Sequence, residues 1–161
     1  MLNGSDLAAL RPGRLLAIDL GTKRVGIAVT DELRITVTPV DRIERRSWKE
    51  LLRQIAALIE SYDARALIIG LPLNMDGSKG PAAAEAARLA ENFRKSLSVP
   101  VFLQDERLTS MAAAEEMKEL GLSPAEIGRR VDSHSAALIM RDFLAQARIL
   151  PEDETGLVDA T

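Results

Sequence analysis

Short apolar runs alternate with helix-forming segments along most of this 161-residue chain. Residues 15–20 and 66–71 are nearly continuous apolar runs of strand length, which is typical of strands buried on both faces of a sheet. Residues 25–30 form another β-rich run, and a tight Gly-Thr-Lys turn joins it to the first run as a hairpin. Helical periodicity separates the later strands. This order predicts one α/β domain with a mixed five-stranded sheet flanked by helices.

Caps and prolines mark the ends of the predicted elements. Ser47 and Glu50 form a capping box that predicts a helix start, and Pro81 predicts another helix by standing at its first position. Pro39 places the strand at 35–43 at a sheet edge, because proline cannot donate a ladder hydrogen bond. We further expect a strand at 99–104, helices at 109–120, from 123 and at 132–147, an N-terminal arm at 1–13, a domain at 14–147 and an acidic C-terminal tail at 148–161.

The composition limits the chemistry that this chain can perform. It has no cysteine and one histidine, His134, which excludes thiol catalysis, disulfides, iron–sulfur clusters and zinc sites built from cysteine or several histidines. Any bound metal must therefore be held by oxygen atoms, which favours magnesium, manganese or calcium. No run approaches the ~20 apolar residues of a membrane span, and the N-terminus lacks the pattern of a secretory signal. We therefore expect no membrane contact and a cytoplasmic location.

The net charge of −3 does not exclude a nucleic-acid partner. The tail at 148–161 carries four acids against one arginine, and it accounts for the whole net charge. In the rest of the chain, a basic run either binds a polyanion or is the solvated start of a helix, and charge alone does not decide between the two. The run comprises Arg42, Arg45, Arg46, Lys49 and Arg53.

Three carboxylates stand at unusual positions. Asp19 interrupts the first apolar run, and Asp132 lies on the buried stripe of the last predicted helix, at its first turn. Glu106 follows the last predicted strand. Each residue also has an ordinary interpretation. Asp19 would then accept hydrogen bonds from the turn, Glu106 would form a loop ion pair with Arg107, and Asp132 would stabilise the helix dipole.

Together these carboxylates predict an oxygen-only cluster where a strand, a strand end and a helix start converge. Such a cluster repels itself unless a divalent cation neutralises it. Mg²⁺ or Mn²⁺ held by carboxylates, with positions left open for water, suits phosphodiester hydrolysis without a nucleophilic side chain. The residues alone therefore favour a metal-dependent nuclease that uses Asp19, Glu106 and Asp132.

Four short runs resemble, in order, the motifs of one known family. The family is that of the Holliday-junction-resolvase-like proteins, also called "putative pre-16S rRNA nucleases", and the resemblance covers roughly residues 14–147. Ser110 departs mildly from the threonine that is more frequent at its position, but it keeps the hydroxyl. The runs are Asp-Leu-Gly-Thr-Lys-Arg-Val-Gly at 19–26, Gly-Leu-Pro-Leu-Asn-Met-Asp-Gly-Ser at 70–78, Asp-Glu-Arg-Leu-Thr-Ser at 105–110 and Asp-Ser-His-Ser-Ala-Ala at 132–137.

The resemblance implies a ribonuclease-H-like fold with strand order 3-2-1-4-5 and an antiparallel second strand. It implies that Asp19, Glu106 and Asp132 bind Mg²⁺ or Mn²⁺ and carry the catalysis. The implied partner is nucleic acid, and the implied reaction is hydrolysis of phosphodiester bonds in 5′-end processing of pre-16S rRNA during ribosome biogenesis. The alternative is resolution of four-way DNA junctions in recombination and repair, which predicts a homodimer with two active sites.

Substrate contacts are predicted beside the carboxylates. Lys23 and Arg24 follow Asp19 and are placed to reach phosphates next to the scissile bond, and Arg107 has the same position relative to Glu106. In addition, Asn74 lies in a polar loop between a strand and a helix, where substrate contacts are frequent. An ordinary surface or turn role remains an equal alternative for each of the four.

Two other classes of protein stay open from the sequence. An Asp-x-Gly-Thr run near the N-terminus also opens the ATPases of the sugar kinase, actin and Hsp70 type, but those proteins close two such domains on the nucleotide. The second alternative is a non-catalytic RNA-binding or DNA-binding module, such as a transcription factor. Three acids near a bound polyanion argue against that module.

Overall fold

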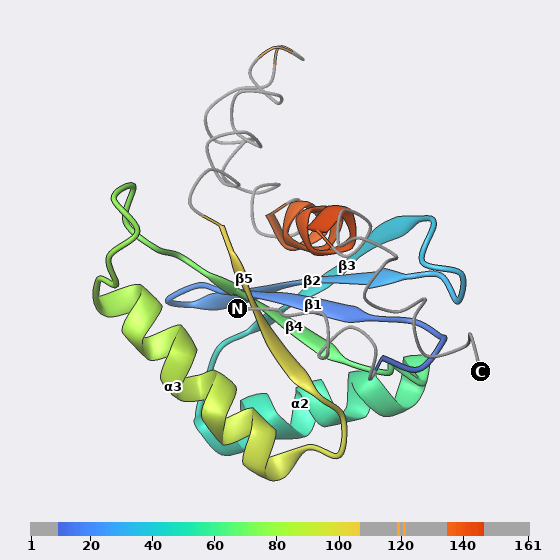
Figure 1. Ribbon diagram of the computed structural model, residues 1–161. Helices are drawn as coiled ribbons and strands as arrows, with labels where there is room; N and C mark the ends of the chain where they lie inside the picture. Colours follow the sequence, from blue (N-terminus) through green and yellow to red (C-terminus); the bar gives the residue numbers. More distant parts are fainter. Residues whose placement is uncertain (1–9, 107–118, 120, 122–134, 147–161) are drawn as a thin grey trace, which may run out of the picture.

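Five strands form one mixed sheet in the computed structural model, which describes residues 10–106, 119, 121 and 135–146 (Figure 1). The elements are β1 (Leu16–Leu20), β2 (Arg24–Thr30), β3 (Val37–Glu44), α2 (Trp48–Tyr62), β4 (Leu67–Leu71), α3 (Pro81–Ser96) and β5 (Val101–Asp105), together with a helix at 135–146. The strand order is β3-β2-β1-β4-β5. β2 pairs antiparallel with both β1 and β3, whereas β4 pairs parallel with both β1 and β5. This topology confirms the predicted order 3-2-1-4-5 with an antiparallel second strand.

Helices cover both faces of the sheet, α2 and α3 on one side and the helix 135–146 on the other (Figure 1). Successive residues of β1 point to opposite faces. Ile18 packs in the cluster that contains Ile55 of α2 and Phe93 of α3, and Ala17 packs in the cluster that contains Phe143. Asp19, two residues after Ala17, therefore faces the side covered by the helix 135–146.

The two helices on the first face begin where the sequence predicts. At the start of α2, Ser47 Oγ accepts a hydrogen bond of 3.2 Å from the Glu50 amide. Pro81 is the first residue of α3, where its missing N–H is not needed. α2 ends at Asp63, whose φ of 51° is in the left-handed region that stops a helix. Local signals therefore set where both helices start and where α2 ends.

β3 lies at the sheet edge, as Pro39 predicts, but it begins two residues later than expected. The strand starts at Val37 rather than at residue 35. The Asp31 Oδ1 atom accepts hydrogen bonds from the amides of Ile35 (2.7 Å) and Thr36 (2.9 Å). These amides close the loop instead of joining the β2–β3 ladder, so a side-chain acceptor decides where the strand begins.

Several predicted elements lie outside the described residues. They are most of the N-terminal arm at 1–13, the helices at 109–120 and from 123, the start of the last helix and the acidic tail. Within the part that the structure describes, no helix combines the length and the apolar character needed to cross a membrane.

Candidate active site

The carboxyl ends of three parallel strands meet on the face covered by the helix 135–146. Ile18 of β1 pairs with Ile69 of β4, and the next residue of β4, Gly70, pairs with Gln104 of β5. Asp19, Gly70 and Gln104 therefore follow one another across the sheet. Functional groups of α/β domains commonly gather at this end of the strands.

Glu106 lies over strand β4, in the space that Gly70 leaves free. It follows β5 directly, and its amide donates a hydrogen bond of 3.1 Å to the Leu71 carbonyl. A Cβ atom at Gly70 would lie 2.4 Å from Glu106 Oε2 and 2.5 Å from Ile139 Cδ1. Any side chain at this position would force Glu106 and Ile139 to shift. The Glu106 carboxylate is thereby directed from β5 toward Asp19 on β1.

Burial and a neighbouring negative charge act on Glu106. Its exposed fraction is 9%, and its Oε2 atom has no hydrogen-bond partner among the described residues. The pKa of Glu106 rises from 4.5 to about 8. Burial is the largest cause, and the negative charges of Asp19 and Asp105 add to it. Asp19 and Glu106 are therefore close enough to repel each other when both are ionised.

This pair of carboxylates fits a divalent cation. An unpartnered buried oxygen is unfavourable by about 1–3 kcal/mol, and a cation beside Glu106 Oε2 would satisfy it. Carboxylate oxygens are the ligands that Mg²⁺ and Mn²⁺ prefer. Among the described residues, no three acidic or histidine side chains form a metal-binding group. The third predicted ligand, Asp132, lies outside the described residues, three positions before the helix 135–146, and Arg107 lies outside them as well.

A glycine turn follows Asp19 and carries two of the predicted substrate contacts. The Gly21 amide donates hydrogen bonds to the carbonyls of Arg24 (2.9 Å) and Asp19 (3.2 Å). A Cβ at Gly21 would lie 2.6 Å from the Arg24 carbonyl oxygen, so the turn is too tight for a side chain at this position. Lys23 stands exposed on the turn, next to the carboxylate pair in sequence. Its contact with substrate stays a prediction.

Arg45, directly after β3, stabilises this turn through hydrogen bonds. The sequence did not reveal this role. The Arg45 amide donates to the Lys23 carbonyl (2.8 Å), and its Nη1 donates to the Gly21 carbonyl (2.9 Å). Its Nη2 pairs with Glu85 of α3. In the sequence, Arg45 is one cation of a basic run, and nothing local distinguishes it from its neighbours, because Glu85 belongs to a distant helix.

Asn74 organises the loop between β4 and α3. Its amide donates to the Ser78 carbonyl (2.9 Å), and its Nδ2 donates to Ser78 Oγ (3.0 Å). Ser78 in turn donates from its amide to Asp76 Oδ1 (2.9 Å). Asn74 is exposed and has a clear structural role in the loop. Its predicted contact with substrate is a separate role that these bonds do not test.

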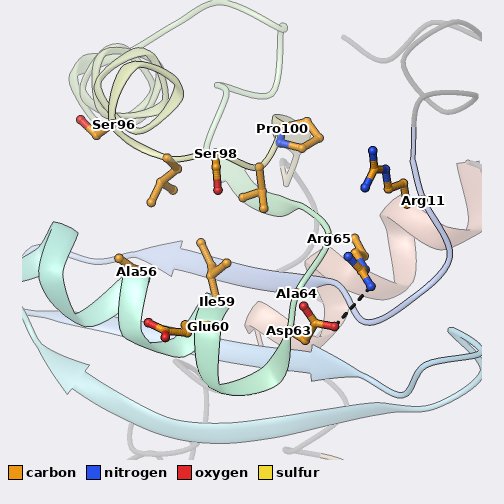
Figure 2. Close-up of a pocket in the computed structure, with 12 residues that line it drawn as sticks. Arg11, Ala56, Ile59, Glu60, Asp63, Ala64, Arg65, Ser96, Ser98 and Pro100 are labelled. Carbon is orange, nitrogen blue, oxygen red and sulfur yellow. Dashed lines mark hydrogen bonds and ion pairs between the residues drawn. The ribbon is translucent and has the colours of Figure 1, made fainter.

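A separate cleft of about 790 Å³ lies near the amino ends of β4 and β5 (Figure 2). Its lining includes Arg11, Ile59 and Pro100, and an ion pair of 3.3 Å joins Arg65 to Asp63 at its wall. None of the predicted catalytic or substrate-binding residues that the structure describes lines this cleft. The candidate active site is therefore the carboxylate pair at the opposite end of the strands.

The family profile described as "RuvX: Holliday junction resolvase" matches residues 13–146. The chain belongs to this family. A "Putative pre-16S rRNA nuclease" from Roseiflexus sp. (strain RS-1) is 36% identical over 137 residues, which are 85% of this chain and 97% of that relative. A protein of the same name from Anaeromyxobacter sp. (strain K) is 41% identical over 131 residues, covering 81% and 96%. The structure "T. thermophilus RuvC in complex with Holliday junction substrate" has a TM-score of 0.49 and 15% identity, covering 83% of this chain and 96% of that one.

Membership in the RuvX family confirms the resemblance carried by the four sequence motifs, and the strand order agrees with the ribonuclease-H-like fold that this resemblance implies. The family is one of nucleases, so this RuvX family member is a hydrolase by class. The matched region contains Asp19 and Glu106, and it also contains Asp132.

Proposed function

We propose that this RuvX family member is a divalent-metal-dependent nuclease that acts in 5′-end processing of pre-16S rRNA. The observation that carries the proposal is the position of the Glu106 carboxylate over Gly70, beside Asp19, with Oε2 unpartnered. The names of the curated relatives support the RNA substrate. This role also favours the cytoplasm, where bacterial ribosomes assemble.

Each residue has a proposed task in the reaction. Asp19, Glu106 and Asp132 hold Mg²⁺ or Mn²⁺, which when bound lowers the pKa of an attacking water and stabilises the leaving oxygen. Before the cation binds, Glu106 holds a proton at neutral pH because burial and Asp19 raise its pKa. Glu106 must therefore release this proton to serve as a ligand. Its burial also keeps bulk water away from one side of the site.

Substrate binding is proposed for the residues beside the carboxylates. Lys23, Arg24 and Arg107 contact phosphates next to the scissile bond, because cations there neutralise the charge that nucleic acid brings near Asp19. Asn74 contacts the substrate from its ordered loop. These contacts hold the phosphodiester in place and leave the hydrolytic chemistry to the carboxylates.

Resolution of four-way DNA junctions is the second candidate, because the family description names a Holliday junction resolvase. Such an enzyme cuts two strands and needs two active sites. It therefore predicts a two-fold dimer, which RNA processing does not require.

A cleavage assay on three substrates tests these proposals. The substrates are a pre-16S rRNA fragment, a synthetic four-way DNA junction and a plain duplex, each with Mg²⁺, with Mn²⁺ or with EDTA. We expect metal-dependent cleavage of the RNA, reduced about a hundredfold or more by Asp19→Asn, Glu106→Gln and Asp132→Asn. Asp41→Asn, at an exposed position of β3, controls for loss of one acidic charge.

Other outcomes of the assay discriminate the alternatives. Cleavage of the junction alone would favour the resolvase. Unchanged cleavage in EDTA would exclude metal dependence. If Asp19→Asn binds the RNA as the unmodified protein does and neither protein cleaves it, the chain is a binding module. Tight ATP binding with phosphate release would instead revive the ATPase alternative.

A further inference from the structure

Two buried oxygen atoms near the carboxylate pair have no partner. Gln104 is 3% exposed and Ser135 is 0% exposed. Gln104 Oε1 and Ser135 Oγ make no hydrogen bond within the part of the chain that the structure describes, and neither does Glu106 Oε2. Buried polar atoms are nearly always paired in folded proteins, because an unpaired one is unfavourable. Three of them on one face of the sheet indicate a group from outside the chain that completes their hydrogen bonding.

Gln104 presents its amide oxygen on the same face as Glu106. Its Cα partner is Gly70, which has no side chain to fill the neighbouring space. Phe102, two residues earlier, packs against side chains of the helix 135–146. Residues two apart in a strand point to the same face, so Gln104 also faces this helix. The Gln104 Nε2 atom donates a hydrogen bond of 3.3 Å to the Asp105 carbonyl. This bond occupies a donor and leaves Oε1 as a free acceptor.

Ser135 lies at the same end of the sheet, because of the direction of its helix. Ile139 comes close to Gly70 at the carboxyl end of β4. One turn later, Phe143 packs against Phe102, near the start of β5, with ring centroids 5.7 Å apart. The helix therefore runs from the carboxyl ends of the strands toward their amino ends. Ser135, one turn before Ile139 on the same stripe, lies at the carboxyl ends.

We propose that Gln104 Oε1 and Ser135 Oγ accept hydrogen bonds from water molecules bound to the divalent cation held by Asp19 and Glu106. The inference rests on the proposed function and deepens it. Water on a cation donates hydrogen bonds, and the carboxylates and the Gln104 amide oxygen are acceptors. A phosphate group would meet the same acceptors with its own oxygens and be repelled. Mg²⁺ and similar cations keep several water ligands in protein sites, so water molecules are present to donate to these two oxygens.

Mn²⁺ titration of the full-length chain, followed by the electron paramagnetic resonance signal of free Mn²⁺, tests the proposal. Gln104→Met and Ser135→Ala each remove an unpartnered oxygen with little change in shape. We expect each to raise the Kd for Mn²⁺ about tenfold or more, and Ser135→Ala to leave the Tm in EDTA unchanged or higher. Gln104→Met also loses the hydrogen bond from Nε2 to the Asp105 carbonyl, so its Tm in EDTA should fall slightly. Gln54→Met is the control, because Gln54 Oε1 is also unpartnered but belongs to α2, on the other face. It should leave the Kd unchanged.

Asp19→Asn separates failure of this inference from failure of the proposed function. If Asp19→Asn weakens Mn²⁺ binding but Gln104→Met and Ser135→Ala do not, the water-binding role is wrong and the metal site stands. If Asp19→Asn also binds Mn²⁺ normally, the metal site itself is wrong. A clear loss of Tm in EDTA for Ser135→Ala would show that the Ser135 oxygen has a partner within the protein, which also overturns the inference.

Discussion

The Glu106 carboxylate occupies the space that a side chain at Gly70 would fill, with Oε2 2.4 Å from the position of that absent Cβ. The contact explains how Asp19 on β1 and Glu106, just after β5, come together although β4 lies between them. The gap at Gly70 in β4 allows an acid that follows the edge strand to reach across. The geometry of the site therefore depends on an absent side chain as much as on the carboxylates themselves.

Gly70→Ala should lower both the stability of the fold and the affinity for Mn²⁺, because the added methyl group displaces Glu106 and Ile139. The added methyl would collide with Glu106 and with Ile139, and we expect a loss of about 1–3 kcal/mol in the free energy of unfolding. The displaced carboxylate should also weaken Mn²⁺ binding. Urea unfolding and Mn²⁺ titration measure the two effects separately.

Ile139→Val provides the partner variant for this prediction. It removes the Cδ1 atom that lies 2.5 Å from the added Cβ, so it should restore part of the stability lost in Gly70→Ala. It leaves the collision with Glu106 in place and should not restore Mn²⁺ binding. Normal Mn²⁺ affinity in Gly70→Ala alone would show that the carboxylate does not need this gap.

Glu106 should make the stability of the metal-free protein depend on pH. Its pKa rises from 4.5 to about 8, chiefly through burial, so between these values the folded state keeps a proton that the unfolded state has released. The free energy of unfolding should therefore fall as the pH rises through this window, by on the order of a few kcal/mol. Below the window this penalty is absent, and above it the penalty is complete.

Glu106→Gln tests this pH dependence, because glutamine does not ionise. Urea unfolding in EDTA at acid, neutral and alkaline pH should show that the advantage of the variant over the unmodified protein grows as the pH rises. Equal pH profiles for the two proteins would mean that Glu106 ionises normally in the folded state.

Arg45 should act on substrate binding through the turn that carries Lys23. Arg45→Lys keeps the charge but loses the planar fork that contacts Gly21 and Glu85. We expect KM for the nucleic acid to rise several-fold, with little change in the Kd for Mn²⁺. Steady-state cleavage kinetics and Mn²⁺ titration measure these two quantities.

Arg53→Lys is the matched variant for Arg45. Arg53 belongs to the same basic run, but it is exposed, and among the described residues it pairs with Glu50, one turn earlier on α2. Its replacement should leave KM unchanged. Equal effects of the two substitutions would indicate that the basic run binds substrate through its arginines as a group, rather than through the braced turn.

The sheet and its flanking helices could be predicted because their signals are local. Ser47 caps α2, Pro81 opens α3 and Pro39 marks the edge strand, and each acts within a few residues of its own position. The start of β3 was wrong by two residues, because the Asp31 side chain captures amides that the β-propensity assigns to the strand. The ends of a strand depend on individual hydrogen bonds, and residue propensities carry no information about these bonds.

The site could be predicted only in part. Asp19 was noticeable because a charge in an apolar strand needs a partner, and its face follows from the two-residue period of a strand. The gap at Gly70 depends on the register between β4 and β5, which the sequence does not state. The brace from Arg45 to Glu85 likewise joins residues that only the fold brings together.

Anomalous diffraction from crystals of the full chain soaked in Mn²⁺ tests the central claim most directly. We predict a manganese peak within coordination distance of both the Asp19 and the Glu106 carboxylates, over Gly70, and no such peak in Asp19→Asn crystals. A Mn²⁺ soak that leaves this position empty while manganese binds elsewhere on the protein would contradict the account.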